Sequence, residues 1–431
     1  MELEVFQSKV EGRIEAPSSK SYTHRALAIS LLAKGRGKIR QPLLAEDTKA
    51  TLSACRVLGA KVEEGEVCEV EGTGGRLKPT SQLIDAANSG TTMRFMTAIC
   101  SLSPVPIRLV GDESLSRRPM GPLVEALRAL GVRARCEGKD GRPPVVVEGG
   151  GLRGGEVEIE GGTSSQFISA LLLACPYAER DVGITVTGTV RSRPYIEMTL
   201  KLLDMSGARI KRSGDLANYE IEGGQVFRPL EVRIPGDFSS AAFPLGAAAL
   251  TGKVRVENLN LEDPQGDKRI VSLLEEFGAE VRTGEGWVEV SKGGLNAIEV
   301  DCADNPDLVP ILAVLGSVAD GVTRISGVPH LRFKETDRLA VLTRELSKMG
   351  ARITELEDGL KITGVRELRG ARLNSFGDHR MAMAFAVAGL VARGKTVVEG
   401  SECIPVSYPT FVADMRLIGA NLREIGSGTA G

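Results

Sequence analysis

The chain has 431 residues, of which 42% are apolar and 26% are charged, and its formal net charge is −2 at pH 7. This length exceeds what one hydrophobic core normally supports, so we expect two or more domains. The small net charge provides no global basic field, and neither a nucleic acid nor a membrane surface is expected as a partner.

The cysteine and histidine content argues against a metal site or a disulfide framework. Seven cysteines are scattered singly without a CxxC pair, and the chain has only three histidines. This pattern predicts a reducing cytoplasm, no metal and no cofactor. The first residues lack the features of a signal peptide, and the longest apolar runs are too short to span a bilayer.

A Gly-Ala or Gly-Val pair recurs six times along the chain, with its glycines 69 to 76 positions apart. Each pair follows an amphipathic helical segment, such as residues 122–130, and precedes an alternating segment typical of a strand. Glycine suits the left-handed residue that ends a helix, so we predict a helix, a glycine stop and a strand in every copy. The glycines are Gly59, Gly131, Gly207, Gly278, Gly350 and Gly419.

Each copy also contains a second, almost wholly apolar segment, which predicts a helix buried inside its domain. Examples are residues 167–174, 241–250, 308–319 and 381–392. The helices begin with small, polar or charged residues, which usually act only as caps. Six such starts directed at one cleft would form an anion site, because helix N-termini expose unpaired N–H groups and partial positive charge. In chain order the starts are residues 18–21, 88–92, 163–166, 237–240, 305–307 and 377–380.

Basic side chains lie at or beside these starts, and they predict a ligand with several negative charges. Arginine holds carboxylate or phosphate through two parallel hydrogen bonds, whereas lysine is a mobile point charge that can also act as an acid. A single arginine on a helix is more often a solvated surface residue, and Arg117-Arg118 forms either a mobile clamp or a plain surface turn. The basic residues are Lys20, Arg25, Arg94, Arg117, Arg118, Arg191, Arg193, Lys334, Arg338 and Arg380.

Four acidic residues share this neighbourhood, and a carboxylate among cations suits proton transfer. Helix capping explains Asp307 and Asp378 equally well, and ion pairing within one helical turn explains Glu335 and Asp337. The sequence contains no phosphate-binding loop, nucleophile elbow or dinucleotide fingerprint in a suitable context. The residues alone therefore indicate a repeat-built α/β protein that binds a polyanionic small molecule in an interdomain cleft, with acid–base chemistry.

Seven motifs resemble those of the enolpyruvyl transferases, and of the EPSP synthase family in particular. They are residues 17–25 (PSSKSYTHR), 88–94 (NSGTTMR), 118–119 (RP), 164–166 (SSQ), 192–195 (SRPY), 334–338 (KETDR) and 378–382 (DHRMA). The resemblance implies an α/β fold of two lobes, each of three βαβαββ-type units with buried helices, an inside-out α/β barrel with six repeats in all. One discontinuous lobe would hold residues 1–17 and 235–431, an inserted lobe would hold residues 18–234, and the active site would lie in the cleft between them.

The resemblance also implies an activity, the transfer of the enolpyruvyl group of phosphoenolpyruvate to the 5-hydroxyl of shikimate 3-phosphate by addition and elimination. Asp307 would accept the hydroxyl proton, and Glu335 with Lys20 would donate a proton to the methylene carbon. Shikimate 3-phosphate would be bound by Lys20, Ser21, Arg25, Ser164, Ser165, Gln166, Ser192, Asp307 and Lys334. Phosphoenolpyruvate would be bound by Lys20, Gly90, Arg118, Gln166, Arg338 and Arg380. No metal is implied, and we expect a monomer.

Two positions depart from the pattern of many relatives, and two alternative functions stay open. Val406 stands where many relatives have a phosphate-contacting lysine, and His330 stands where they often have asparagine. The sister family that uses UDP-N-acetylglucosamine carries a cysteine in its mobile loop, whereas residues 111–122 contain none. A non-catalytic repeat scaffold would explain the sixfold period, but not the clustering of cations and carboxylates at buried helix starts.

Overall fold

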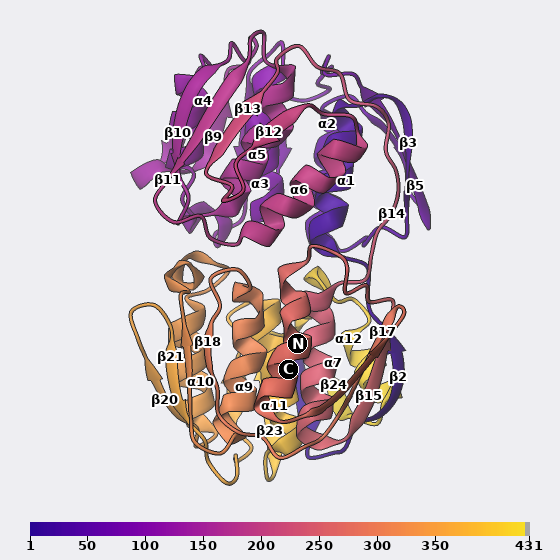
Figure 1. Ribbon diagram of the computed structural model, residues 1–431, viewed down its shortest axis with the longest axis vertical. Coiled ribbons are helices and arrows are strands. Elements are labelled where there is room, and N and C mark those ends of the chain that lie inside the picture. Colours follow the sequence, from indigo (N-terminus) through magenta and orange to yellow (C-terminus); the bar gives the residue numbers. More distant parts are fainter. Residues whose placement is uncertain (427–431) are drawn as a thin grey trace, which may run out of the picture. The chain divides into compact units, whose positions relative to one another are not determined.

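A computed structural model describes residues 1–426, and the chain divides into two compact units. One unit, here called the inserted unit, comprises Ser18–Ile234. The other, here called the split unit, comprises Met1–Pro17 together with Pro235–Gly431. Each unit contains three four-stranded sheets, and within a unit helices lie between strands of different sheets (Figure 1).

The inserted unit contains three repeats of strand, helix, strand, helix, strand, strand, and the first strand of the first repeat is supplied by residues 231–233 at the end of the unit. Its first sheet, ordered β14-β3-β5-β4, has β14 Glu231–Arg233, α1 Lys20–Leu32, β3 Lys34–Arg40, α2 Glu46–Val57, β4 Lys61–Glu63 and β5 Val67–Thr73. The second, ordered β6-β7-β9-β8, has β6 Leu83–Asp85, α3 Gly90–Ile99, β7 Ile107–Val110, α4 Gly121–Ala129, β8 Ala134–Gly138 and β9 Arg142–Val147. The third, ordered β10-β11-β13-β12, has β10 Gly155–Glu160, α5 Ser165–Ala174, β11 Val182–Thr187, α6 Arg193–Met205, β12 Ile210–Arg212 and β13 Asn218–Ile221.

The split unit repeats the same order, with two of its strands supplied by the first residues of the chain. One sheet, ordered β16-β17-β15-β2, has β2 Glu11–Glu15, α7 Phe238–Thr251, β15 Lys253–Glu257, α8 Ile270–Phe277, β16 Glu280–Gly284 and β17 Trp287–Ser291. The next, ordered β18-β19-β21-β20, has β18 Glu299–Asp301, α9 Val309–Val318, β19 Val322–Ser326, α10 Arg338–Lys348, β20 Arg352–Glu355 and β21 Leu360–Thr363. The last, ordered β22-β23-β1-β24, has β22 Arg372–Asn374, α11 His379–Val391, β23 Lys395–Glu399, α12 Phe411–Leu417, β24 Asn421–Ile425 and β1 Glu2–Phe6.

The first helix of each repeat is the buried one. All 14 residues of α7 are buried, and α7, α9 and α11 pack on one another at the centre of the split unit. In the inserted unit α3 packs on both α1 and α5. Each fully buried Leu, Ile or Phe contributes about 1.5–3 kcal/mol, so apolar helices are stable only where other helices and sheets surround them.

The second helix of each repeat is amphipathic and ends at the predicted glycine. In α4, for example, Leu123, Val124, Ala126 and Leu127 are buried and the opposite face is polar. The six glycines that follow these helices all have left-handed backbone conformations, with φ from 82° to 104°. A side chain is strained in that region, which explains why glycine recurs there.

The predicted α/β fold with six repeats in two lobes is confirmed, with one difference at the start of α9. The sheets remain six separate open sheets, and within residues 1–426 no sheet closes into a barrel. Residues 305–307 do not begin the buried helix directly, because a short 3-10 helix at Pro306–Leu308 precedes α9. In this part of the chain no helix is both long and apolar enough to cross a membrane.

Candidate functional site

Serine hydroxyls cap all three buried helices of the inserted unit. Ser19 accepts a hydrogen bond from the backbone of Tyr22 at 3.4 Å, and Ser89 accepts one from Thr92 at 3.2 Å. Ser164 caps α5 in the same way. The capping prediction is therefore confirmed for these serines, and the remaining N–H groups of each first turn give these helix starts partial positive charge.

Lys20, the first residue of α1, forms an ion pair with a carboxylate that the sequence motifs did not reveal. Its Nζ lies 2.9 Å from Oδ2 of Asp47, in the first turn of α2. Both side chains are largely buried, so little water screens the pair. No motif identifies Asp47, because the contact exists only where α2 packs on α1.

Arg25 is a buried guanidinium that hydrogen-bonds only to neutral oxygens. It is 1% exposed, and its Nε donates to Oγ1 of Thr199 at 2.7 Å. Its two terminal nitrogens donate to the backbone oxygens of Ser21 and Tyr195, each at 2.9 Å. Burial lowers the pKa of Arg25 to about 10. Within the described chain no carboxylate pairs with this cation, so its charge favours an anion close by.

Two further arginines flank the start of α3. Arg94 donates to Oε1 of Gln166 at 2.5 Å, and its guanidinium lies over the ring of Phe167. Arg118 is 6% exposed, and its Nη2 donates to Oδ1 of Asn88 at 2.9 Å. A Cβ added at Gly90 would lie 3.0 Å from Nη1 of Arg118 and 3.3 Å from Nη1 of Arg94. The alternative that Arg118 belongs to a plain surface turn is therefore wrong.

Ser192 has an unusual backbone conformation for its residue type. With φ 53° and ψ 40° it is left-handed, and it is buried immediately before α6. A non-glycine residue in this region costs free energy that the surrounding structure must offset, and such residues cluster at functional sites. Ser165 is buried at the first position of α5.

Arg338 organises the carboxylates of the split unit. It is 1% exposed, and its guanidinium reaches Asp378 and Asp307 at 2.8 Å and Glu335 at 2.9 Å. Burial alone would lower the pKa of Arg338, but the three carboxylates outweigh it and raise the pKa above its ordinary value. One buried cation thus holds three acidic side chains from three different segments in one place.

Asp307 does not cap the following helix. It lies within Pro306–Leu308, and α9 has no side-chain cap. Its two carboxylate oxygens pair with Arg338 at 2.8 Å and with Arg380 at 3.2 Å. The capping alternative for Asp307 is therefore wrong, whereas Asp378 both accepts from the backbone of Arg380 and pairs with Arg338.

The motif KETDR spans the start of α10, since residues 334–337 precede the helix and Arg338 is its first residue. Asp337 caps α10 through Ala340 and pairs with Arg332, and Glu335 pairs with the arginine three residues later. Local ion pairing is thus confirmed for Glu335, whereas the partner of Asp337 lies five residues earlier, farther than one helical turn. This pairing does not exclude a further role for Glu335.

Lys334 and the two atypical positions lie in irregular segments of the split unit. Lys334 is half-buried and follows the 3-10 helix Pro329–Phe333, in which His330 is buried. Val406 is half-buried at the end of the 3-10 helix Ser401–Val406, which packs on α11. Its apolar side chain offers no hydrogen-bond donor to an anion.

The predicted residues thus fall into two groups, one in each unit. The inserted unit carries Lys20, Ser21, Arg25, Gly90, Arg118, Ser164, Ser165, Gln166 and Ser192. The split unit carries Asp307, Lys334, Glu335, Arg338 and Arg380. Asp47, which the sequence reasoning missed, adds a carboxylate to the first group, and Asp378 adds one to the second.

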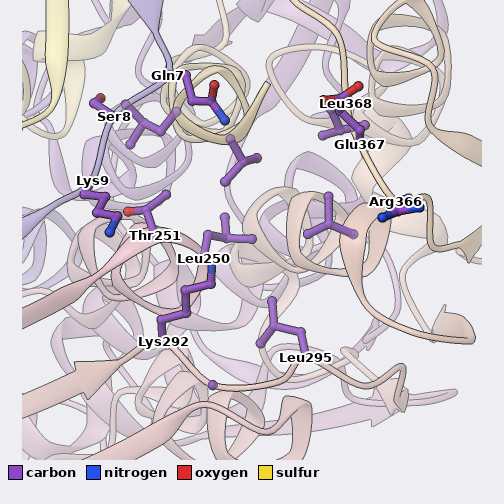
Figure 2. A pocket seen from close by; sticks show the side chains of 14 residues that line it. Gln7, Ser8, Lys9, Leu250, Thr251, Lys292, Leu295, Arg366, Glu367 and Leu368 are labelled. Atoms are coloured by element: carbon purple, nitrogen blue, oxygen red, sulfur yellow. The ribbon is translucent and has the colours of Figure 1, made fainter. Parts of the chain in front are cut away.

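A separate pocket of about 980 Å³ lies at the opposite ends of the split unit's buried helices (Figure 2). It is lined by Leu250 and Thr251 at the end of α7, Val318 at the end of α9, and Leu390 and Val391 at the end of α11. Helix C-termini carry partial negative charge, and the charged side chains of this lining are Lys9, Lys292, Arg366 and Glu367. No predicted site residue lines this pocket.

Within residues 1–426 no group of three or more His, Cys, Asp or Glu side chains is arranged to hold a metal ion. The cysteines are all free thiols.

Known proteins match the chain over almost its whole length. The sequence model of EPSP synthase (3-phosphoshikimate 1-carboxyvinyltransferase) matches residues 6–415. A 3-phosphoshikimate 1-carboxyvinyltransferase of Methanothrix thermoacetophila is 46% identical over 98% of this chain and 99% of its own length. One of Methanocaldococcus jannaschii is 41% identical over 96% and 97%.

A solved structure of the EPSP synthase of Acinetobacter baumannii agrees with the fold. It has a TM-score of 0.81 and 29% identity, and the match covers 98% of this chain and 99% of that one. The resemblance first drawn from seven short motifs therefore extends to the whole sequence and to the arrangement of its elements. The chain belongs to the EPSP synthase family.

Proposed function

We propose that the chain transfers the enolpyruvyl group of phosphoenolpyruvate to the 5-hydroxyl of shikimate 3-phosphate, with release of phosphate. This is a step of the shikimate pathway towards the aromatic amino acids. The observation that supports the proposal most directly is that the two units carry different charged groups. The inserted unit holds a buried guanidinium without a carboxylate partner, whereas the split unit holds carboxylates on a buried arginine.

Shikimate 3-phosphate binds, in this proposal, to residues of both units. The hydroxyls of Ser164, Ser165 and Ser192 face its phosphate, and the positive start of α5 and the strained backbone at Ser192 support this assignment. Arg25 adds a buried cation that donates to Thr199 and to two backbone oxygens and, within residues 1–426, forms no ion pair with a carboxylate. The other residues assigned to this substrate are Lys20, Ser21, Gln166, Asp307 and Lys334.

Phosphoenolpyruvate binds, in this proposal, at the start of α3 and against the arginines of the split unit. Arg118 contacts it beside Gly90, where the absence of a side chain leaves room between two guanidinium groups. Gln166 is fixed by Arg94 and by Thr91, so its amide is held in one orientation. The other residues assigned to this substrate are Lys20, Arg338 and Arg380.

The reaction proceeds by addition and elimination, with proton transfers assigned to two carboxyl groups. The 5-hydroxyl attacks C2 of phosphoenolpyruvate and passes its proton to Asp307, while C3 gains a proton from Glu335, assisted by Lys20. The tetrahedral intermediate then expels phosphate and loses a proton from its methyl group. Arg118, Arg338 and Arg380 stabilise the carboxylate and the departing phosphate.

The direct test is phosphate release from the purified protein. Phosphate should appear only when phosphoenolpyruvate and shikimate 3-phosphate are both present, and a chelator should leave the rate unchanged. Release with UDP-N-acetylglucosamine instead would favour the sister activity. A protein that releases phosphate with neither acceptor and shows no thermal shift with either would act as a non-catalytic scaffold.

We further propose that the substrates are held between the two units and that the protein is a cytoplasmic monomer. Each unit carries only part of the assigned residues, so one small ligand must draw both sets together. Small-angle scattering should then show a smaller radius of gyration with shikimate 3-phosphate, and less change in Lys20→Ala. Light scattering after size exclusion should give the mass of one chain.

A further inference from the structure

Asp267 is a buried carboxyl group that the proposed mechanism does not use. It lies in the 3-10 helix Gly266–Arg269 and is 3% exposed. Its Oδ2 accepts a hydrogen bond from Oγ of Ser239, the second residue of α7, at 2.5 Å. Its Oδ1 is buried and has no hydrogen-bond partner in the described part of the chain. Burying a charged oxygen without a hydrogen-bond partner costs more free energy than burying a neutral carboxyl group in the same place.

The position of Asp267 is fixed by the residues just before it. Gln265 accepts from the backbone of Phe238 at 3.0 Å and donates to the backbone oxygen of Gly236 at 2.9 Å. These bonds hold the 3-10 helix against the start of α7. An asparagine at position 267 would accept the hydrogen bond from Ser239 equally well. These hydrogen bonds therefore do not require an acid at position 267.

Of the three charged groups that act on Asp267, two belong to the proposed site, namely Asp307 and Arg380. Asp307 precedes α9, Arg380 lies in the first turn of α11, and Asp237 caps α7. The pKa of Asp267 is raised to about 7, chiefly by burial and next by Asp307, with a smaller contribution from Asp237, and this is the net result after Arg380 and the Ser239 hydrogen bond lower it. Cys302 also faces it, but burial raises the pKa of that thiol to about 12, so it stays neutral.

Resting on the proposed function, we propose that Asp267 is a positioning residue that stays uncharged while Asp307 is ionised and so keeps Arg380 available to phosphoenolpyruvate. Two neighbouring carboxyl groups do not both ionise readily. Arg380 already pairs with Asp307 at 3.2 Å. An ionised Asp267 would share that cation and add a negative charge facing an anionic substrate. Below neutral pH Asp267 keeps its proton during the whole reaction, and the hydroxyl proton of the acceptor goes to Asp307.

The test compares the Michaelis constant for phosphoenolpyruvate in the wild type and in Asp267→Asn, from about pH 6 to about pH 9. Asparagine imitates the neutral acid, so the two enzymes should agree at low pH. Above neutrality the wild-type constant should rise about threefold or more relative to the variant, with little change in kcat. Because phosphoenolpyruvate ionises identically in both assays, the ratio isolates Asp267.

Two further variants separate this role from a structural one. Glu276→Gln neutralises an exposed carboxylate on the adjacent α8. Its Michaelis constant for phosphoenolpyruvate should depend on pH as that of the wild type does. Ser239→Ala removes a hydrogen bond that favours the ionised form, so the rise should move to higher pH. If Asp267 only held the 3-10 helix against α7, Ser239→Ala would change the stability of the protein, but the pH profile of its Michaelis constant would match that of the wild type. Parallel profiles for Asp267→Asn and the wild type would overturn the proposal.

An infrared measurement distinguishes failure of this proposal from failure of the proposed function. The wild type at low pH should show a protonated-carboxyl band that disappears at high pH and is missing from Asp267→Asn. The band requires no substrate, so it would persist if the protein proved to have another activity. An active enzyme without the band would show that Asp267 is ionised and that the inference is wrong.

Discussion

Replacing Gly90 with alanine should separate the binding of phosphoenolpyruvate from the stability of the fold. The added Cβ would lie 3.0 Å from Nη1 of Arg118 and 3.3 Å from Nη1 of Arg94. Both nitrogens are the ends of flexible side chains, so they should move by a few tenths of an ångström while α3 stays in place. Alanine is about 1 kcal/mol more favourable than glycine in a helix interior, and less so in the first turn. The stability should therefore be unchanged or slightly higher.

The cost should appear in the affinity for phosphoenolpyruvate. A hydrogen bond to a charged group contributes about 1.5–3 kcal/mol, and displacing Arg118 should lose about half of one such contact. A loss of about 1.4 kcal/mol corresponds to a tenfold change in binding. We therefore expect the Michaelis constant for phosphoenolpyruvate to rise about tenfold, while that for shikimate 3-phosphate changes little.

Steady-state kinetics with each substrate varied in turn would measure this effect, with thermal unfolding as the stability readout. Gly121→Ala is a matched control, because Gly121 is also the first residue of a helix in the same repeat. The nearest atom to its added Cβ is 3.6 Å away, an ordinary contact. If Gly90→Ala behaved like Gly121→Ala, or if it weakened both substrates equally, the assignment of the start of α3 to phosphoenolpyruvate would be refuted.

Three other predictions follow from the split unit. Asp307→Asn and Glu335→Gln should each lower turnover about 10²–10⁴-fold while thermal shift still detects shikimate 3-phosphate, and near-normal turnover would remove either residue from the proton transfers. Asp378→Asn breaks a fully buried ion pair and should lower the free energy of unfolding by about 3–5 kcal/mol, measured by denaturant unfolding. The control Glu113→Gln breaks an exposed ion pair and should lower it by less than about 1 kcal/mol. Equal losses in the two variants would contradict the argument from burial. Because the pKa of Asp267 is raised from 3.8 to about 7, the folded state holds this proton more tightly than the unfolded state does. The resulting contribution to stability is fully present below pH 3.8 and is lost as the pH rises to about 7. The melting temperature of Asp267→Asn should therefore fall less than that of the wild type over this range, and identical slopes would show that Asp267 does not titrate in the folded state.

The amino-acid sequence by itself determined the repeat, its helices and the family. Six glycines at nearly equal spacing mark six helix ends, because only glycine adopts the left-handed conformation there without strain. Segments such as 241–250 predict buried helices, since no helix face there is polar. Capping by Ser19, Ser89 and Ser164 also follows from local preference. These features depend on residues close together in the chain, where sequence rules are strongest.

Only the tertiary structure decided which charged groups pair and which stay unneutralised. Lys20 and Asp47, or Arg25 and Thr199, meet because separate helices pack together, and no spacing rule reports such contacts. The sequence left Asp307 open as a helix cap, and its position inside Pro306–Leu308, before a helix without a side-chain cap, settled that question. No motif in the sequence identifies Asp267, because the pKa of a carboxyl group depends on its burial and on neighbours that are distant in the chain. Those surroundings form only when segments far apart in the chain fold against one another.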